Sequence, residues 1–172
     1  MRGIASHLVA TTFLALSGVA GNAMAASPVR IAVFPFELMD FSAAFPYVAS
    51  DDIDREQLRL STEEARRLIA ESGRYELVDV GGANEQVAEV GQLRDCDGCE
   101  AGIAARLAAD QSMIGIVTRI TRMEFTVTYK IRDARSGALV DVQQTDLRMG
   151  ANVAWSRGAR WLIQRRLLEQ PQ

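Results

Sequence analysis

Cys96 and Cys99 are the residues of this 172-residue chain whose types and spacing most directly indicate chemistry. They are its only cysteines, and they form a Cys-x-x-Cys motif, Cys96-Asp97-Gly98-Cys99, in front of an alanine-rich helical pattern. Such a pair can form a structural disulfide, exchange disulfides with another thiol, or supply two metal ligands. In an oxidising compartment a Cys96–Cys99 disulfide is the first expectation, and a redox-active pair is the alternative.

The chain has one histidine, His7, and it lies in a segment that we expect to be removed. A mature chain without histidine has no Ser–His or Cys–His pair and no imidazole metal ligand. The sequence also lacks a G-x-S-x-G elbow and a phosphate-binding glycine loop. We therefore predict a protein that is not an enzyme, with no catalytic residues, no cofactor and no metal site.

Residues 1–25 have the pattern of a cleavable signal peptide. Arg2 is the positive n-region, Leu8–Ala20 is a short apolar region, and Ala23-Met24-Ala25 is a small-x-small cleavage site. No later apolar run is long enough to span a bilayer, so we predict a periplasmic protein with no integral membrane segment after cleavage. Loss of Arg2 changes the formal net charge from −3 to −4, which argues against a nucleic-acid partner.

An acidic segment follows the first predicted strand. Residues 37–60 show no strong periodicity, which predicts a long irregular loop, and such loops are often functional. The acidic side chains that we consider as partner-binding candidates are Asp40, Asp51, Asp52 and Asp54. A calcium loop counted from Asp52 would need glycine at its sixth position, where the chain has Gln57.

The hydrophobic pattern predicts five strands and four helices in one domain, residues 26–172. A Ser61–Glu64 capping box predicts a helix over residues 61–71, because the two residues can satisfy each other's backbone amides. The expected order is β-α-β-α-α-β-β-β-α, which indicates an α/β fold with a mixed sheet of about five strands and helices packed on it. The predicted strands are 29–36, 75–80, 112–123, 124–133 and 139–147, and the other helices are 83–92, 100–109 and 152–169. Pro35 should end the first strand, because proline cannot donate a ladder hydrogen bond. Apolar and polar residues alternate over 124–133, which predicts that one side of this strand is buried, and the helix over 100–109 has one apolar face. The apolar residues of the strand are Phe125, Val127, Tyr129 and Ile131, and those of the helix are Ile103, Ala104 and Leu107.

The closing helix has an apolar face that carries Trp155, Gly158 and Trp161. Aromatic residues at helical spacing usually belong to the core, so we expect both tryptophans to be buried. A glycine on that face predicts that the helix lies close to the sheet. Val87 and Val90 are the expected apolar anchors of the helix over residues 83–92.

Four motifs resemble those of a family of uncharacterised exported bacterial proteins, and more distantly the N-terminal domain of TolB and CsgG-like envelope proteins. The resemblance implies a small α/β domain with protein–protein roles in the cell envelope, and it provides no catalytic residues to transfer. The family's Leu-Gly-Ala-Asp after the cysteine motif is Leu107-Ala108-Ala109-Asp110 here. The motifs are Val33-Phe34-Pro35-Phe36-Glu37-Leu38-Met39-Asp40, Ile69-Ala70-Glu71-Ser72-Gly73-Arg74-Tyr75-Glu76-Leu77-Val78-Asp79, Leu93-Arg94-Asp95-Cys96-Asp97-Gly98-Cys99 and Ile131-Arg132-Asp133-Ala134-Arg135-Ser136-Gly137.

Three functions are compatible with these observations. The leading hypothesis is a non-enzymatic periplasmic accessory module that binds another envelope protein, through the acidic loop or an exposed sheet edge. The second is a thiol–disulfide redox or redox-sensing protein that uses Cys96 and Cys99. The third is a periplasmic carrier of a small molecule, with a pocket between the closing helix and the sheet.

Overall fold

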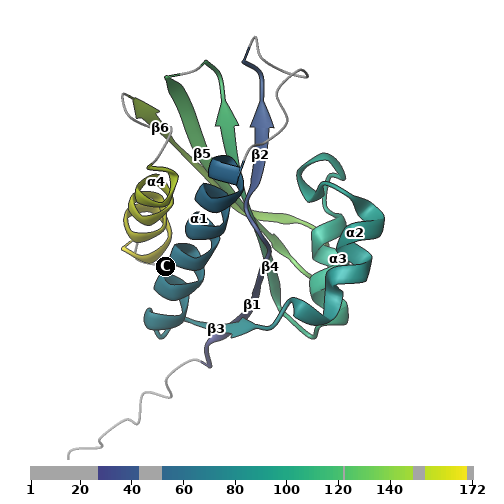
Figure 1. Cartoon of the computed structure of the whole chain (residues 1–172). Helices are drawn as coiled ribbons and strands as arrows, with labels where there is room; N and C mark the ends of the chain where they lie inside the picture. Colours follow the sequence, from purple (N-terminus) through teal and green to yellow (C-terminus); the bar gives the residue numbers. More distant parts are fainter. Residues whose placement is uncertain (1–26, 43–51, 122, 149–153, 170–172) are drawn as a thin grey trace, which may run out of the picture.

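The computed structural model describes residues 27–42, 52–121, 123–148 and 154–169. A six-stranded sheet separates two layers of helices (Figure 1). Helices α1 (Asp52–Glu71) and α4 (Trp155–Leu162) cover one face, while α2 (Asn84–Val90) and α3 (Cys99–Arg106) cover the other. The predicted fold class, a single α/β domain with a mixed sheet, is confirmed.

The sheet is parallel on one side and antiparallel on the other. Strands follow the order β3-β1-β4-β5-β6, and β2 also pairs with β4. The pairs β1–β3, β1–β4 and β2–β4 are parallel, whereas β4, β5 and β6 form an antiparallel meander. The bounds are β1 (Val29–Val33), β2 (Glu37–Asp40), β3 (Tyr75–Val78), β4 (Gln111–Arg119), β5 (Glu124–Asp133) and β6 (Leu139–Arg148).

Strand β2 lies in a segment that we predicted to be irregular. Pro35 ends β1 as expected, but the chain then pairs again with the same neighbour, β4. The interruption leaves two backbone groups without ladder partners, and α1 satisfies both: Thr62 Oγ1 accepts the Phe36 N–H at 2.8 Å, and Arg66 Nη2 donates to the Val33 carbonyl at 2.7 Å. The second strand therefore depends on contacts with a distant helix.

Helix α1 begins at Asp52, nine residues before the predicted start. The predicted capping box is wrong, because Ser61 lies inside the helix and its hydroxyl donates to the Gln57 carbonyl at 2.7 Å. A buried serine inside a helix satisfies its hydroxyl in this way. The irregular loop is consequently shorter than predicted, and part of it, residues 43–51, lies outside the described residues.

Each face of the sheet has its own apolar core. The predicted alternation in β5 is confirmed, since Phe125, Val127, Tyr129 and Ile131 are all buried on the side of α1 and α4. On the other side, alternate residues of β4 pack against α3, chiefly Ile114 and Ile116 with Ile103 and Ala104. In the helix predicted over residues 100–109, Ile103 and Ala104 are buried as expected, and Leu107 is partly buried against the same core.

The closing helix confirms two expectations and corrects one. Trp155 is fully buried, and Gly158 lies so close to the sheet that a Cβ there would be 2.9 Å from Leu147 and 3.0 Å from Val127. Trp161, which we expected in the core, is 45% exposed. The helix also continues as a π-helix, η4 (Ile163–Leu168), so a fixed 3.6-residue period does not describe its C-terminal half.

Candidate functional site

The cysteine motif forms a compact turn between a short 3₁₀ helix, η2 (Leu93–Asp95), and α3. Cys96 and Cys99 are joined by a disulfide. The two residues between them have left-handed backbones, with φ +47° at Asp97 and +111° at Gly98. Closing a four-residue loop contributes about 2 kcal/mol of stability in the chain-entropy account.

Glu37 in β2 holds the N-terminal side of this turn. Its carboxylate accepts the backbone N–H groups of Leu93 at 2.8 Å and Arg94 at 3.0 Å. The Arg94 guanidinium lies 3.5 Å from the same carboxylate. Glu37, which belongs to the motif Val33–Asp40, therefore positions the cysteine motif across a separation of more than fifty residues.

Arg132 in β5 holds the other side of the turn. It donates to Asp97 Oδ1 at 2.8 Å and to the Gly137 carbonyl at 3.0 Å. Its Nε also lies 3.1 Å from Oε1 of Glu100, a carboxylate whose residue is only 1% exposed. Sequence reasoning did not single out Glu37, Glu100 or Arg132, because the pairing of these residues depends on which strands become neighbours.

Glu100 also lies beside the disulfide. Its Oε2 is 3.9 Å from Cys96 Sγ, and the ligand atoms of Cys96, Cys99 and Glu100 all lie within 4.8 Å of one another. In this oxidised state the two sulfurs are bonded to each other and Oε1 pairs with Arg132, so the group does not present a set of metal ligands. The arrangement is a buried carboxylate placed against a partly exposed disulfide.

The acidic partner-binding candidates have different environments. Asp40 and Asp54 are nearly buried, and both pair with Arg119, at 2.8 Å and 2.5 Å. Burial raises the pKa of Asp40, but hydrogen bonds from Ser42 and Arg119 outweigh it and lower that pKa overall. Asp52 is exposed and pairs with Arg55, whereas Asp51 lies outside the described residues. Asp40 and Asp54 thus present little surface to a partner and instead join β2, α1 and β4.

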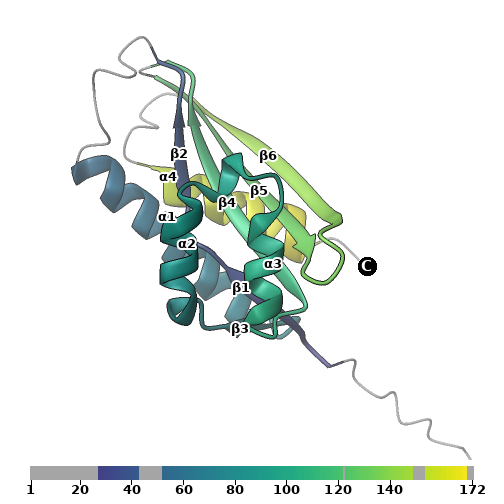
Figure 2. The ribbon, with the colours of Figure 1, turned by 90° about the vertical axis from the view of Figure 1, so that its right-hand side faces the viewer.

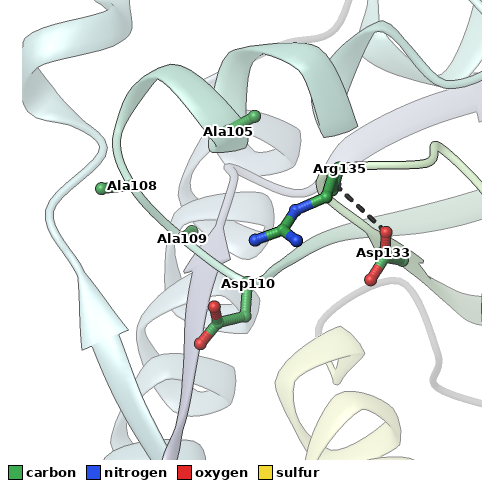
Figure 3. A pocket seen from close by; sticks show the side chains of 6 residues that line it. All are labelled: Ala105, Ala108, Ala109, Asp110, Asp133 and Arg135. Atoms are coloured by element: carbon green, nitrogen blue, oxygen red, sulfur yellow. Dashed lines mark hydrogen bonds between the residues drawn. The ribbon is translucent and has the colours of Figure 1, made fainter.

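A cavity of about 510 Å³ lies between the C-terminal end of α3 and the β5–β6 hairpin (Figure 3). The side chain of Arg135 extends toward Asp110 across an alanine-rich wall. Ala108, in that wall, has φ +57°, a left-handed conformation at the position where the related pattern has glycine. This cavity is not at the closing helix, where the carrier hypothesis places a ligand. It is lined by Ala105, Ala108, Ala109, Asp110, Asp133 and Arg135.

Strand β6 presents an apolar surface. It is the last strand of the sheet, so the backbone groups on its outer edge have no partner strand among the described residues. Figure 2 shows α2 and α3 in front of the other end of the sheet, with no helix drawn in front of β6. Leu139, Val140 and Val142 are consequently 49%, 53% and 44% exposed. We call these three residues and the outer edge of β6 the β6 surface.

Within the described part of the chain, no helix combines the length and apolar character needed to cross a bilayer. A comparison with curated proteins found no match. Solved structures similar in fold include the C-terminal domain of LpoB from Escherichia coli, with a TM-score of 0.51, 13% identity, and coverage of 76% of this chain and 90% of that one.

Two further solved structures match this chain in the comparison. Lipoprotein GNA1162 from Neisseria meningitidis has a TM-score of 0.50 and 15% identity, with coverage of 73% of this chain and 84% of that one. TolB from Acinetobacter baumannii has a TM-score of 0.44 and 13% identity, with coverage of 84% and 29%. At such identities the similarity to LpoB and GNA1162 shows the fold alone. The predicted membership in an uncharacterised family is confirmed by a family model that matches residues 29–167. The chain belongs to the DUF3280 family, described as "Protein of unknown function (DUF2380)".

Proposed function

We propose that this protein is a non-enzymatic accessory module of the bacterial cell envelope that binds another protein through the β6 surface. The observation that carries the proposal is the exposure of Leu139, Val140 and Val142 beside an unpaired strand edge. Natural edge strands are commonly protected by lysine, proline or a covering segment, because an unprotected edge can pair with another strand. β6 contains no lysine or proline, and its charged residues are Asp141, Asp146 and, at the last position, Arg148.

The partner expected on this surface is an extended segment that adds as a further strand. Main-chain hydrogen bonds would give affinity, and side chains at alternate positions would contact Val140 and Val142. Asp146 is the exposed charge on the same face of β6, so a basic residue near one end of the partner segment would complement it. The signal-peptide pattern of residues 1–25 and the fold shared with lipoprotein GNA1162 support a periplasmic location for this contact.

A crosslinking experiment in cells tests the proposal. A photoreactive side chain at Gln144, on the exposed face of β6, should give one discrete adduct on irradiation, and mass spectrometry would identify the partner. The affinity of the purified partner is then measured by calorimetry for Val142→Lys, which places a charge on the β6 surface. We expect at least about a tenfold loss of affinity, the size expected for blocking strand addition at its centre.

The matched control is Val90→Lys, the same change at a valine of α2. Val90, which we expected to anchor this helix, is instead 41% exposed, compared with 44% for Val142, whereas Val87 packs against the core. This control should bind as tightly as the unmodified protein. Equal losses for the two variants, or the absence of a discrete adduct from Gln144, would contradict binding through the β6 surface.

A further inference from the structure

We propose that Cys96 and Cys99 form a thiol–disulfide exchange site in which Glu100 transfers the proton of Cys96. This activity is independent of binding at the β6 surface, because the cysteine motif lies in the turn between η2 and α3. Cys96 Sγ lies 3.0 Å from the Leu93 carbonyl, which cannot take a proton at neutral pH, and 3.9 Å from Oε2 of Glu100. The geometry that carries the proposal is this second separation, because Glu100 is an ionisable carboxylate and is only 1% exposed. A buried carboxylate is costly unless it is paired, and here only Oε1 is paired, with Arg132.

Cys99 is placed to act as the nucleophile of the reduced pair. It is the first residue of α3, and no side chain caps this end of the helix, although the Ala101 amide donates to the Gly98 carbonyl at 3.1 Å. Such a position stabilises a thiolate. Both cysteines are partly exposed, so a second thiol can approach them.

The reaction is an exchange with a dithiol, and it balances without a further oxidant. A thiolate of the dithiol attacks Cys99 Sγ, the Cys96–Cys99 bond breaks, and Cys96 leaves as a thiolate that takes a proton through Glu100. The second thiol of the dithiol loses its proton and attacks the mixed disulfide, and Cys99 leaves as a thiolate. Two electrons pass to the cysteine pair, and the dithiol becomes a disulfide. In the reverse direction Glu100 accepts the proton of Cys96 as Cys96 attacks the mixed disulfide.

Several charged side chains surround the site. Asp97 and Glu100 both pair with Arg132 of β5, and Arg94 lies 3.5 Å from both Glu37 of β2 and Asp95. On α2, the neighbouring helix, Glu85 and Glu89 are both exposed.

The test follows the reduced full chain as it reacts with glutathione disulfide, with acid-quenched samples read by intact mass. Glutathione should first attach to Cys99, as peptide mapping would show, and the adduct should then be released when Cys96 attacks. Glu100→Gln should slow this release by about a hundredfold or more at pH 7, the lower end of the range for general base catalysis. The difference should shrink above about pH 9, where a thiol ionises without assistance.

Glu89→Gln, an exposed carboxylate on α2, is the matched control and should release glutathione at the normal rate. Equal release rates for Glu100→Gln and the unmodified protein would overturn the proposal. If Glu100→Gln does not fold, the cysteine to which glutathione attaches in the unmodified protein tests the proposal instead. Glutathione on Cys96, or oxidised protein that dithiothreitol reduces only as fast as the domain unfolds, would also overturn it.

Discussion

Among the glycines that the structure describes, Gly115, at the centre of β4, is the one where an added Cβ would make the closest contact. A Cβ on Gly115 would lie 2.3 Å from Cε2 and Cζ of Phe36, whereas ordinary contacts are 3.4–4 Å. The Phe36 ring would have to move by about 1 Å, but Phe36 is 4% exposed and its N–H is bound by Thr62. Overpacking of this kind costs about 1–3 kcal/mol, and we expect Gly115→Ala to destabilise the domain by about 3 kcal/mol.

The assay is urea unfolding of the mature chain, followed by circular dichroism and by the fluorescence of the buried Trp155. For a chain of this length the expected loss corresponds to a melting temperature lower by about 6–12 °C. Gly102→Ala is the control, because Gly102 lies in α3 and a Cβ added there would meet nothing within 4 Å. That change should stabilise the protein by about 0.5–1 kcal/mol, since alanine is favoured over glycine in a helix.

A double-mutant cycle tests the stated cause. Phe36→Ala removes the ring that Gly115→Ala would displace, so the alanine at position 115 should cost much less in that background. The expected coupling is about 1–3 kcal/mol. A loss below about 0.5 kcal/mol for Gly115→Ala alone, or additive effects in the cycle, would contradict the reasoning. The packing of the Phe36 ring would then not be the reason that position 115 requires glycine.

Two further changes test local features of the fold. Ala108→Gly should stabilise the domain by about 1 kcal/mol in thermal unfolding, because Ala108 has a left-handed backbone, whereas Ala105→Gly, one turn earlier in α3, should destabilise it by up to about 1 kcal/mol. Destabilisation by Ala108→Gly would contradict this reading. Asp40→Asn should cost about 2 kcal/mol at pH 7 in urea unfolding. Because the pKa of Asp40 is lowered in the fold, its contribution is complete above the unfolded value of 3.8 and is lost as the pH falls through the lower folded value. A difference between Asp40→Asn and the unmodified protein that persists unchanged at pH 2 would refute this account of the ion pair.

Some features of the candidate site could be predicted and others could not. The disulfide partners followed from a count of cysteines and their spacing, because a chain with two cysteines allows one intramolecular pairing. The roles of Glu100 and Arg132 did not, since a buried carboxylate and a solvent-facing one look alike in a sequence. The same holds for Asp40 and Asp54, whose pairing with Arg119 depends on β2, α1 and β4 meeting.

The sequence by itself determined the features set by local periodicity and composition. Alternation fixed which side of β5 is buried, the glycine on the apolar face of α4 indicated a close approach to the sheet, and the order of elements defined an α/β fold. These signals are read from neighbouring residues, and no distant contact is needed to interpret them.

Only the tertiary structure decided the features that depend on distant partners. β2 forms because Thr62 and Arg66 satisfy the backbone at the Pro35 interruption, and the early start of α1 overrides a strong local capping signal at Ser61. The exposure of Val140 and Val142 likewise follows from where α2 and α3 end on the sheet. Hydrogen-bond satisfaction and burial are properties of the assembled layers. They therefore decide which conformation a segment adopts where its local sequence is compatible with more than one.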